Sequence, residues 1–264
     1  MIFNIDWQGG FDMIKVLMHG CNGKMGRMIT DLIRDDERME IVAGVDMYTE
    51  VTNTYPVFKN IEECDVDCDV IIDFSNAGAV ESLLDYSVDK KIPVVLCTTG
   101  LSEEQLNKVN EASKKTAVLK SANMSLGINL LMKVLKEVSP VLAKAGYDIE
   151  LVERHHNQKV DAPSGTAIAL ADSINESLDN EYTYVYDRSA VRAKRDPKEI
   201  GISAVRGGTI VGDHEVIFAG LDEVVELKHR AYSRSVFGKG AVEAAAYLAG
   251  KEPGMYGMDD VIQL

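Results

Sequence analysis

The sequence predicts an α/β protein with two domains, the first built on a parallel sheet of the Rossmann type and the second of the α+β class. Two patterns support this expectation. Between residues 13 and 126, short apolar runs alternate with longer segments whose apolar residues recur at helical spacing, as they do in successive β-α-β units. Between residues 201 and 231, strand-like runs follow one another with no helix between them, which is typical of an α+β domain.

The expected elements follow in order along the chain. Strands are predicted at 14–19, 39–45, 69–73, 93–97 and 116–121, because these runs are short and apolar. Crossover helices are predicted where Met25, Ile29 and Ile33, and later Val80 and Leu84, recur at helical spacing. The second domain is expected to contain helices at 126–144 and 165–178 and strands at 147–154, 201–206, 209–219 and 223–231. The helical segment 241–250 is expected to return to the first domain, so the predicted domains are 13–126 with 236–264, and 127–235.

The first twelve residues do not fit this pattern. They contain the single tryptophan of the chain and show no apolar period, whereas Met13 stands directly before the first predicted strand. The stretch from Gly9 to Asp12 can be back-translated into a ribosome-binding sequence and a short spacer, directly before the ATG codon of Met13. We therefore interpret 1–12 as a non-native extension from a misassigned start, with a tag remnant or a natural N-terminal arm as the alternatives.

Composition and charge exclude several classes of partner. The chain of 264 residues has 42 acidic and 28 basic side chains, a net charge of −14, which would repel nucleic acid and anionic membranes. No apolar run approaches the roughly 18 residues that a bilayer span requires. Asp65, Asp67 and Asp69 resemble the start of a calcium loop, but the required glycine is missing, so no metal is expected. The cysteines lack disulfide-framework or zinc spacing and are expected to be reduced thiols in a cytoplasmic protein: Cys21, Cys64, Cys68 and Cys97.

A glycine-rich turn follows the first predicted strand and opens the first predicted helix. Glycines permit a close approach of the backbone, and a helix N-terminus offers unpaired N–H groups to a pyrophosphate. Asp46 ends the second strand about 20 residues later, where a carboxylate would accept hydrogen bonds from the ribose of a dinucleotide. The alternative is a glycine-rich turn beside a surface aspartate, since the GxxGxxG spacing alone is a weak signal. The candidate dinucleotide residues are Gly20, Cys21, Asn22, Gly23, Lys24, Met25 and Asp46.

A second constellation occupies residues 153–166, before the helix predicted at 165–178. His155 and His156 are neighbours in an extended segment, so their side chains point to opposite sides and one of them can face a given pocket. Histidine and lysine can be tuned for general acid catalysis near neutral pH, and Lys159 stands close by. Ser164 is a typical N-cap, so the N–H groups after it form a candidate carboxylate site. A loop histidine pair with an ordinary helix cap is the alternative.

Together these segments resemble the 4-hydroxy-tetrahydrodipicolinate reductase (dihydrodipicolinate reductase) family of diaminopimelate and lysine biosynthesis. The similarity extends from Met13 to the C-terminus and is most specific at 153–167, with further motifs at 73–75, 98–100, 121–125 and 205–208. The resemblance implies NAD(P)H-dependent reduction of 4-hydroxy-tetrahydrodipicolinate, via dihydrodipicolinate, to tetrahydrodipicolinate. Two alternatives are a dinucleotide-sensing protein without turnover and another two-domain amino-acid dehydrogenase.

The resemblance also implies roles for domains and residues. The first domain would bind the dinucleotide, and the second would bind the dicarboxylate substrate and assemble a homotetramer. His155 would be the proton donor or acceptor and Lys159 the proton donor, while substrate contacts would come from His156, Gly165 and Thr166. Besides residues 20–25 and Asp46, the implied cofactor contacts are Cys97, Thr98, Thr99, Ser121, Ala122, Asn123 and Met124.

Two departures from the family pattern concern the cofactor. Cys97 replaces the glycine that usually precedes Thr98-Thr99, which affects the packing of that loop. Met47 follows Asp46 where many NADPH-using relatives have an arginine, so no guanidinium is available there for a 2′-phosphate. We therefore expect NADH to be preferred, or both cofactors to be used, with Lys24 as the cation that would offset repulsion from Asp46.

Overall fold

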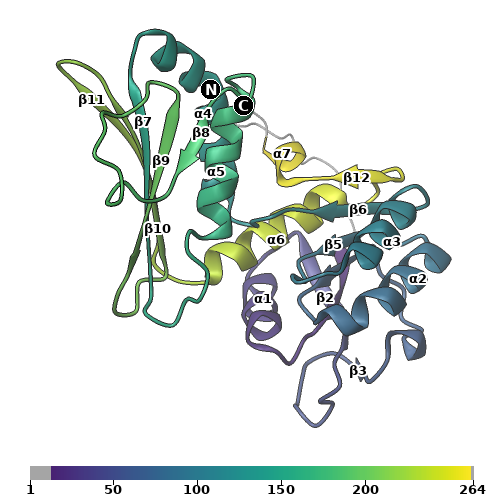
Figure 1. Cartoon of the computed structure of the whole chain (residues 1–264). Coiled ribbons are helices and arrows are strands. Elements are labelled where there is room, and N and C mark those ends of the chain that lie inside the picture. Colours follow the sequence, from purple (N-terminus) through teal and green to yellow (C-terminus); the bar gives the residue numbers. More distant parts are fainter. Residues whose placement is uncertain (1–12, 263–264) are drawn as a thin grey trace. The chain divides into compact units, whose positions relative to one another are not determined.

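The computed structural model describes residues 13–262, which divide into two compact units (Figure 1). Unit 1 contains the chain through Leu119 and also Val242–Met255, and unit 2 contains Lys120–Ala241 and the chain from Tyr256 onward.

The predicted boundaries at 126/127 and 235/236 instead fall inside helices α4 (Leu126–Lys144) and α6 (Ser235–Leu248). The C-terminal tail groups with unit 2, not with the first domain as expected, because Lys133 of α4 donates to two of its backbone carbonyls. The predicted extension 1–12 lies outside the described residues.

Unit 1 is built on a seven-stranded sheet with the order β12-β6-β5-β4-β1-β2-β3. Five strands match predicted runs: β1 (Ile14–His19), β2 (Met39–Val45), β4 (Val70–Asp73), β5 (Val94–Leu96) and β6 (Ala117–Lys120). Two short edge strands were not predicted: β3 (Val57–Phe58) and β12 (Gly254–Tyr256). Strand β1 pairs in parallel with β2 on one side and β4 on the other, so the direction of winding reverses at β1. In open sheets of this kind, ligands bind at the carboxyl ends of the strands beside this reversal.

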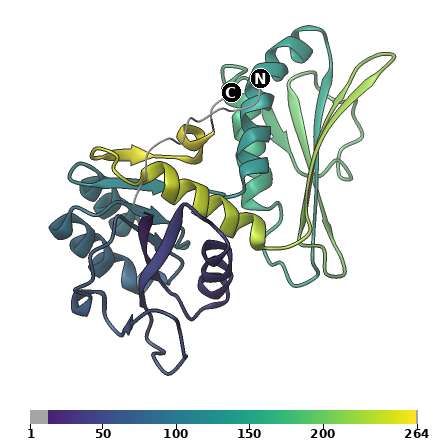
Figure 2. The ribbon, with the colours of Figure 1, turned by 180° about the vertical axis from the view of Figure 1, so that it is seen from behind.

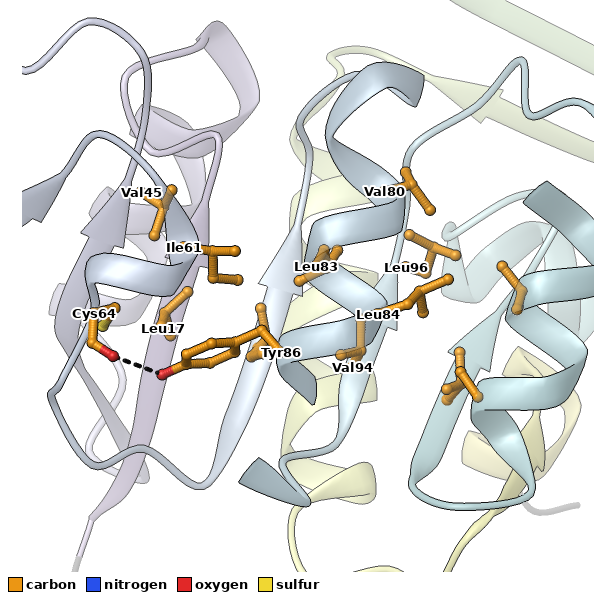
Figure 3. Close-up of a cluster of buried hydrophobic side chains, with 14 of the residues drawn as sticks. Leu17, Val45, Ile61, Cys64, Val80, Leu83, Leu84, Tyr86, Val94 and Leu96 are labelled. Carbon is orange, nitrogen blue, oxygen red and sulfur yellow. Dashed lines mark hydrogen bonds between the residues drawn. The ribbon is translucent and has the colours of Figure 1, made fainter. Parts of the chain in front are cut away.

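Helices cover both faces of this sheet. On one face, α2 (Val80–Lys90) and α3 (Glu103–Ser113) pack over a cluster of buried side chains that includes Leu17 and Val94 (Figure 3). Tyr86 of α2 lies at the edge of the cluster, where its hydroxyl donates a hydrogen bond to the carbonyl of Cys64 at 3.1 Å. The opposite face carries α1 (Lys24–Arg34) and the unit 1 part of α6 (Figure 2). Burial on both faces explains why these strands are continuous apolar runs in the sequence.

Unit 2 is built on a five-stranded sheet with the order β11-β10-β7-β9-β8, and α4 and α5 cover one of its faces (Figure 1). Strands β7–β10 and β10–β11 pair antiparallel, whereas β7–β9 and β8–β9 pair in parallel. Along β7, Ile149, Leu151, Glu153 and His155 are buried, and the residues between them are half-buried. This alternation places Glu153 and His155 on the helix-covered face. The elements are β7 (Asp148–His155), α5 (Gly165–Glu176), β8 (Thr183–Val185), β9 (Glu199–Arg206), β10 (Gly212–Ala219), β11 (Val224–Ala231) and α7 (Met258–Val261).

The two sheets confirm the predicted fold class, a Rossmann-type parallel sheet followed by an α+β unit. Among residues 13–262, no helix combines the length and apolar character that a membrane span requires. Over the same range, no group of three or more histidine, cysteine, aspartate or glutamate side chains is arranged to hold a metal ion.

Candidate functional site

The glycine-rich turn between β1 and α1 packs closely against neighbouring backbone. Gly20 has a φ of +81°, and a Cβ atom there would lie 2.6 Å from the carbonyl oxygen of Phe74. A Cβ atom on Gly26 would lie 2.2 Å from the carbonyl oxygen of Gly20. Gly23 is the N-cap of α1 and supplies no side chain to cap it. The turn therefore requires glycine at positions 20 and 26, and the first N–H groups of α1 have no capping side chain to bond.

A cavity of about 500 Å³ opens beside this turn, at the carboxyl ends of β1, β2 and β4. Gly20 and Gly23 line one part of it, and Asp46 and Met47 line another. The Asp46 carboxylate accepts hydrogen bonds from the backbone N–H groups of Asn22, at 2.9 Å, and Tyr48, at 3.0 Å. A glycine cradle, an uncapped helix N-terminus and a fixed carboxylate fit the pyrophosphate and ribose of a dinucleotide.

Four predicted cofactor residues of the turn are not among those that line this cavity: Cys21, Asn22, Lys24 and Met25. Cys21 is buried beneath the turn, where a Cβ atom on Gly44 would lie 2.7 Å from its Sγ. Burial, with a further contribution from Asp46, raises the pKa of the Cys21 thiol to about 12. Lys24 and Met25 begin α1, and neither is among the residues that line the cavity.

One positively charged side chain that lines the cavity, Lys59, was not predicted as a site residue. The backbone N–H of Asp46 donates to the carbonyl of Phe58 at 3.0 Å, which joins the end of β2 to β3. Lys59 follows Phe58 directly and lines the cavity together with Asp46 and Met47. Strand β3 is two residues long, so no periodic pattern in the sequence marked Lys59 as a neighbour of Asp46.

The predicted Cys97–Thr99 loop lies beside the ends of β1 and β4. The backbone N–H of Cys97 donates to the carbonyl of Asp73 at 3.0 Å. The Asp73 carboxylate is buried and lies 2.7 Å from Nδ1 of His19. Thr98 is also buried, with its hydroxyl 3.4 Å from that of Ser75, whereas Thr99 is exposed. The loop thus joins the carboxyl edge of the sheet that the cavity occupies.

In unit 2, a buried carboxylate holds His155 at the end of β7. One oxygen of Glu153 lies 2.7 Å from Nδ1 of His155. Arg206 donates to both oxygens at 2.7 Å, and the backbone N–H of Ser164 donates at 2.9 Å. Burial alone would raise the pKa of the Glu153 carboxyl, but the hydrogen bonds from Arg206, His155 and Ser164 outweigh it and lower the pKa. Glu153 is therefore an ionised, fully bonded carboxylate at neutral pH.

A second histidine packs against this group. The ring of His214 meets that of His155 edge to face, with centroids 5.2 Å apart, and its Nε2 lies 3.0 Å from the hydroxyl of Ser164. Burial, assisted by His155, lowers the pKa of His214 to about 4. His214 is therefore neutral at physiological pH. Neither His214 nor Arg206 was predicted as a site residue.

His156 and Lys159 lie in the loop that follows β7. His156 lines a cavity of about 390 Å³ with Gly208 and Arg234, and His155 does not line it. The two histidines therefore face different surroundings, as expected of neighbours in an extended segment. The ammonium of Lys159 lies 2.7 Å from the Asp161 carboxylate, and its hydrogen bond lowers the pKa of that carboxyl.

The start of α5 is joined to the predicted 121–124 loop. Ser164 caps the helix, and its hydroxyl accepts from the N–H of Ala167 at 3.2 Å. Gly165 has no atom within 4 Å of its Cβ position, so the first turn of α5 is open. The hydroxyl of Thr166 accepts from the side-chain amide of Asn123 at 2.9 Å. Asn123 therefore connects two groups of residues that were predicted to contact different ligands.

Internal hydrogen bonds shape the 121–124 loop. The hydroxyl of Ser121 donates to the Asn123 carbonyl at 3.0 Å, and the amide of Asn129 in α4 donates to the same carbonyl at 2.7 Å. Met124 is buried, and Ala122 is exposed. Of these four predicted residues, Asn123 alone is shown to contact another predicted site residue outside the loop.

Comparisons with known proteins cover nearly the whole chain. Residues 14–124 match the family model of the dihydrodipicolinate reductase N-terminus, and residues 127–262 match that of the C-terminus. A 4-hydroxy-tetrahydrodipicolinate reductase of Clostridium novyi (strain NT) is 53% identical over 251 residues, which is 95% of this chain and 99% of the relative. One from Brachyspira hyodysenteriae (strain ATCC 49526 / WA1) is 42% identical over 249 residues, 94% of this chain and 100% of the relative. The structure of dipicolinate-bound dihydrodipicolinate reductase from Paenisporosarcina sp. TG-14 aligns with a TM-score of 0.79 and 25% identity, covering 95% of this chain and 100% of that one.

Proposed function

Because the chain belongs to the dihydrodipicolinate reductase family and is a pyridine-nucleotide-dependent 4-hydroxy-tetrahydrodipicolinate reductase, we propose that unit 1 binds the dinucleotide and that unit 2 binds and protonates the substrate. The proposed division rests on one observation. Within unit 2, Glu153 contacts both His155 and the backbone N–H of Ser164, and Ser164 stands directly before the open first turn of α5. The proposal includes a place in diaminopimelate and lysine biosynthesis, in the cytoplasm. The nicotinamide supplies the hydride when it is bound.

The first turn of α5 is the proposed anchor for one substrate carboxylate. The N–H groups of Gly165 and Thr166 stand at a helix N-terminus, where the helix dipole favours an anion. His156 would bind the substrate from the loop after β7. A dicarboxylate needs such donors, because the protein as a whole carries a net charge of −14 and would otherwise repel it.

His155 and Lys159 are the proposed proton-transfer residues. Proton delivery must accompany hydride transfer, because hydride addition to the unsaturated ring leaves a negative charge that a general acid neutralises. Lys159 carries a proton on a flexible side chain, and its bond to Asp161 keeps the ammonium near the start of α5. Asp161 stands three residues before Ser164, so this ion pair lies next to the helix cap along the chain.

A direct assay distinguishes this function from a sensor without turnover. Freshly prepared substrate is added to the purified protein with NADH or NADPH, and oxidation of each cofactor is followed over time. Steady oxidation that depends on substrate supports the reductase. Tight cofactor binding without oxidation would contradict it and support the sensor.

The proposed cofactor preference is NADH, or use of both cofactors. Asp46 can accept hydrogen bonds from the adenosine ribose of NADH, but its charge would oppose the 2′-phosphate of NADPH. Met47 supplies no compensating cation, and Lys24 does not line the cavity. Lys59 does line it, so one flexible positive charge is available to reduce the repulsion without the bidentate contact that an arginine makes.

Replacing Met47 with arginine should raise the ratio of kcat/KM for NADPH to kcat/KM for NADH by about tenfold, since a guanidinium can bind the 2′-phosphate and offset Asp46. Lys59→Gln should lower the same ratio, and Lys114→Gln, at an exposed lysine of unit 1 that does not line the cavity, is the control with no expected change. Steady-state kinetics with both cofactors provide the measurement. A wild-type enzyme at least tenfold more efficient with NADPH, roughly 1.4 kcal/mol, would contradict the proposed preference.

Replacing Thr166 with valine should raise the KM for substrate about five- to tenfold, because a hydroxyl next to the proposed carboxylate anchor is lost while the side-chain shape is kept. The Kd for NADH should stay close to the wild-type value. Thr183→Val, the same change on the exposed strand β8, is the matched control. An unchanged substrate KM in Thr166→Val would argue against this anchor.

We further propose that unit 2 assembles a homotetramer through the face of its sheet that α4 and α5 leave open. Strand β7 presents Glu150, Val152 and Arg154 on that face, and all three are half-buried. Arg154 is paired with Glu215 of β10 at 2.8 Å, so part of the charge on this face is already neutralised. Light scattering of the purified protein should give the mass of four chains, and a monomer at assay concentration would exclude this assembly.

A further inference from the structure

We propose that Glu153 is a positioning residue for the reaction, which fixes the orientation and the tautomer of His155 so that its Nε2 exchanges the proton. The inference rests on the proton-transfer role proposed above for His155. Glu153 does not need to touch the substrate for this role, because it acts entirely through the imidazole and through the start of α5.

The orientation of the ring follows from the bond at its inner nitrogen. Nδ1 of His155 lies 2.7 Å from Glu153, and an ionised carboxylate can only accept a hydrogen bond. Nδ1 must therefore carry a proton, which leaves Nε2 as the nitrogen that can be protonated and deprotonated. A Cβ atom at Gly212 would lie 3.1 Å from Nε2, so glycine at this position leaves free the space beside Nε2 that a side chain would occupy.

The carboxylate itself is held in the ionised form by groups that come from distant parts of unit 2. Arg206 at the end of β9 contacts both oxygens, and Ser164 donates its backbone N–H. Glu153 is fully buried, and without these partners burial would favour its neutral form. A neutral Glu153 could donate to Nδ1 and reverse the tautomer of His155.

The same bonds connect His155 to the proposed substrate anchor. Ser164 donates its N–H to Glu153, and its hydroxyl caps α5 and contacts His214. Glu153 thereby sets the position of the imidazole relative to the first turn of α5. The charged or titratable groups shown against His155 are Glu153 from its own strand, Arg206 through Glu153, and His214 from β10.

The test is a double-mutant cycle between Glu153 and His155. Glu153→Gln should lower kcat by about 10- to 100-fold, with the Kd for NADH unchanged, because the amide preserves the shape of the side chain but not its charge. The substrate KM should stay within about twofold of the wild-type value, so that the loss appears in the chemical step and not in substrate binding. In the His155→Gln background the same change should cost less than twofold.

Two outcomes would overturn the inference. An equal loss in both backgrounds would assign Glu153 a purely structural role, and an unchanged kcat in Glu153→Gln would show that positioning is not needed. If instead His155→Gln alone retains turnover, the proposed role of His155 fails, which is a separate result. If Glu153→Gln does not fold, Glu153→Asp is the second variant. It keeps the negative charge that pairs with Arg206, but its shorter side chain moves the carboxylate away from Nδ1 of His155. A similar loss of kcat is expected.

A matched control exists in unit 1. Two nitrogens of the Arg38 guanidinium and the Arg38 backbone N–H donate to Asp36, much as Arg206 and Ser164 donate to Glu153. Among residues 13–262, no hydrogen bond joins Asp36 to a histidine. Asp36→Asn should leave kcat and the substrate KM of the folded enzyme unchanged. Any loss common to both variants would reflect the removal of a carboxylate–arginine pair.

Discussion

Replacement of His155 with glutamine should lower kcat by roughly 10²- to 10⁴-fold, the usual cost of losing a general acid–base group. Glutamine retains a polar side chain of similar length, but it cannot exchange a proton near neutral pH. The Kd for NADH should remain close to the wild-type value, because the proposed dinucleotide cavity belongs to unit 1 and His155 to unit 2. Steady-state kinetics with fresh substrate and fluorescence titration with NADH provide the two measurements.

The neighbouring histidine is the natural control for this variant. His156 carries the same side chain but lines a cavity that His155 does not line, and the contact with Glu153 is made by His155. His156→Gln should therefore raise the substrate KM with a much smaller effect on kcat. Near-normal turnover of His155→Gln, or a reversal of the two phenotypes, would transfer the proton-transfer role away from His155.

Replacement of Lys159 with alanine should also lower kcat by roughly 10²- to 10⁴-fold, because the proposed proton donor is removed. A small primary amine added to the assay should restore part of the activity, since it can occupy the vacated space and deliver a proton. Lys136→Ala removes a lysine with a similar ion pair, 2.9 Å from Glu176, on the outer side of α4 and α5.

This lysine control separates the loss of a proton donor from the loss of a surface charge. Lys136→Ala should retain wild-type kcat, and added amine should have no effect on it. Full activity of Lys159→Ala without amine would remove Lys159 from the proton-transfer step. A loss of activity with no rescue at any amine concentration would point instead to the ion pair with Asp161, 2.7 Å away, as the contribution of this residue.

Much of the fold could be predicted because burial leaves a direct trace in the sequence. Strands β1 and β2 have the predicted bounds, since each is a run buried in the centre of the parallel sheet. Strands β3, β8 and β12 have two or three residues and lie at sheet edges, so they show no periodicity. Helix α3 was not among the predicted ranges, although Ser102 and Gln105 form a capping box at its start.

The candidate site could be predicted only as far as it is contiguous in the sequence. His155, Lys159 and Thr166 lie within twelve residues of one another, and the motif that contains them is specific. Arg206 and His214 lie beside this motif because of the way the strands pair. His155 of β7 is opposite Arg206 of β9, and Glu153 of β7 is opposite His214 of β10. No spacing rule relates strands that pair out of sequence order, so these partners become visible only when the sheet is formed.

The buried thiol of Cys21 also determines how the glycine turn responds to chemical attack. Thiolates, not thiols, react with alkylating agents and peroxides, and a pKa of about 12 leaves on the order of one Cys21 side chain in 10⁵ ionised at pH 7. The side chain is, in addition, fully enclosed between the turn and Gly44. A cysteine therefore sits inside the turn proposed to bind the dinucleotide, and we expect it to react far more slowly with alkylating agents and peroxides than an exposed, acidic thiol would.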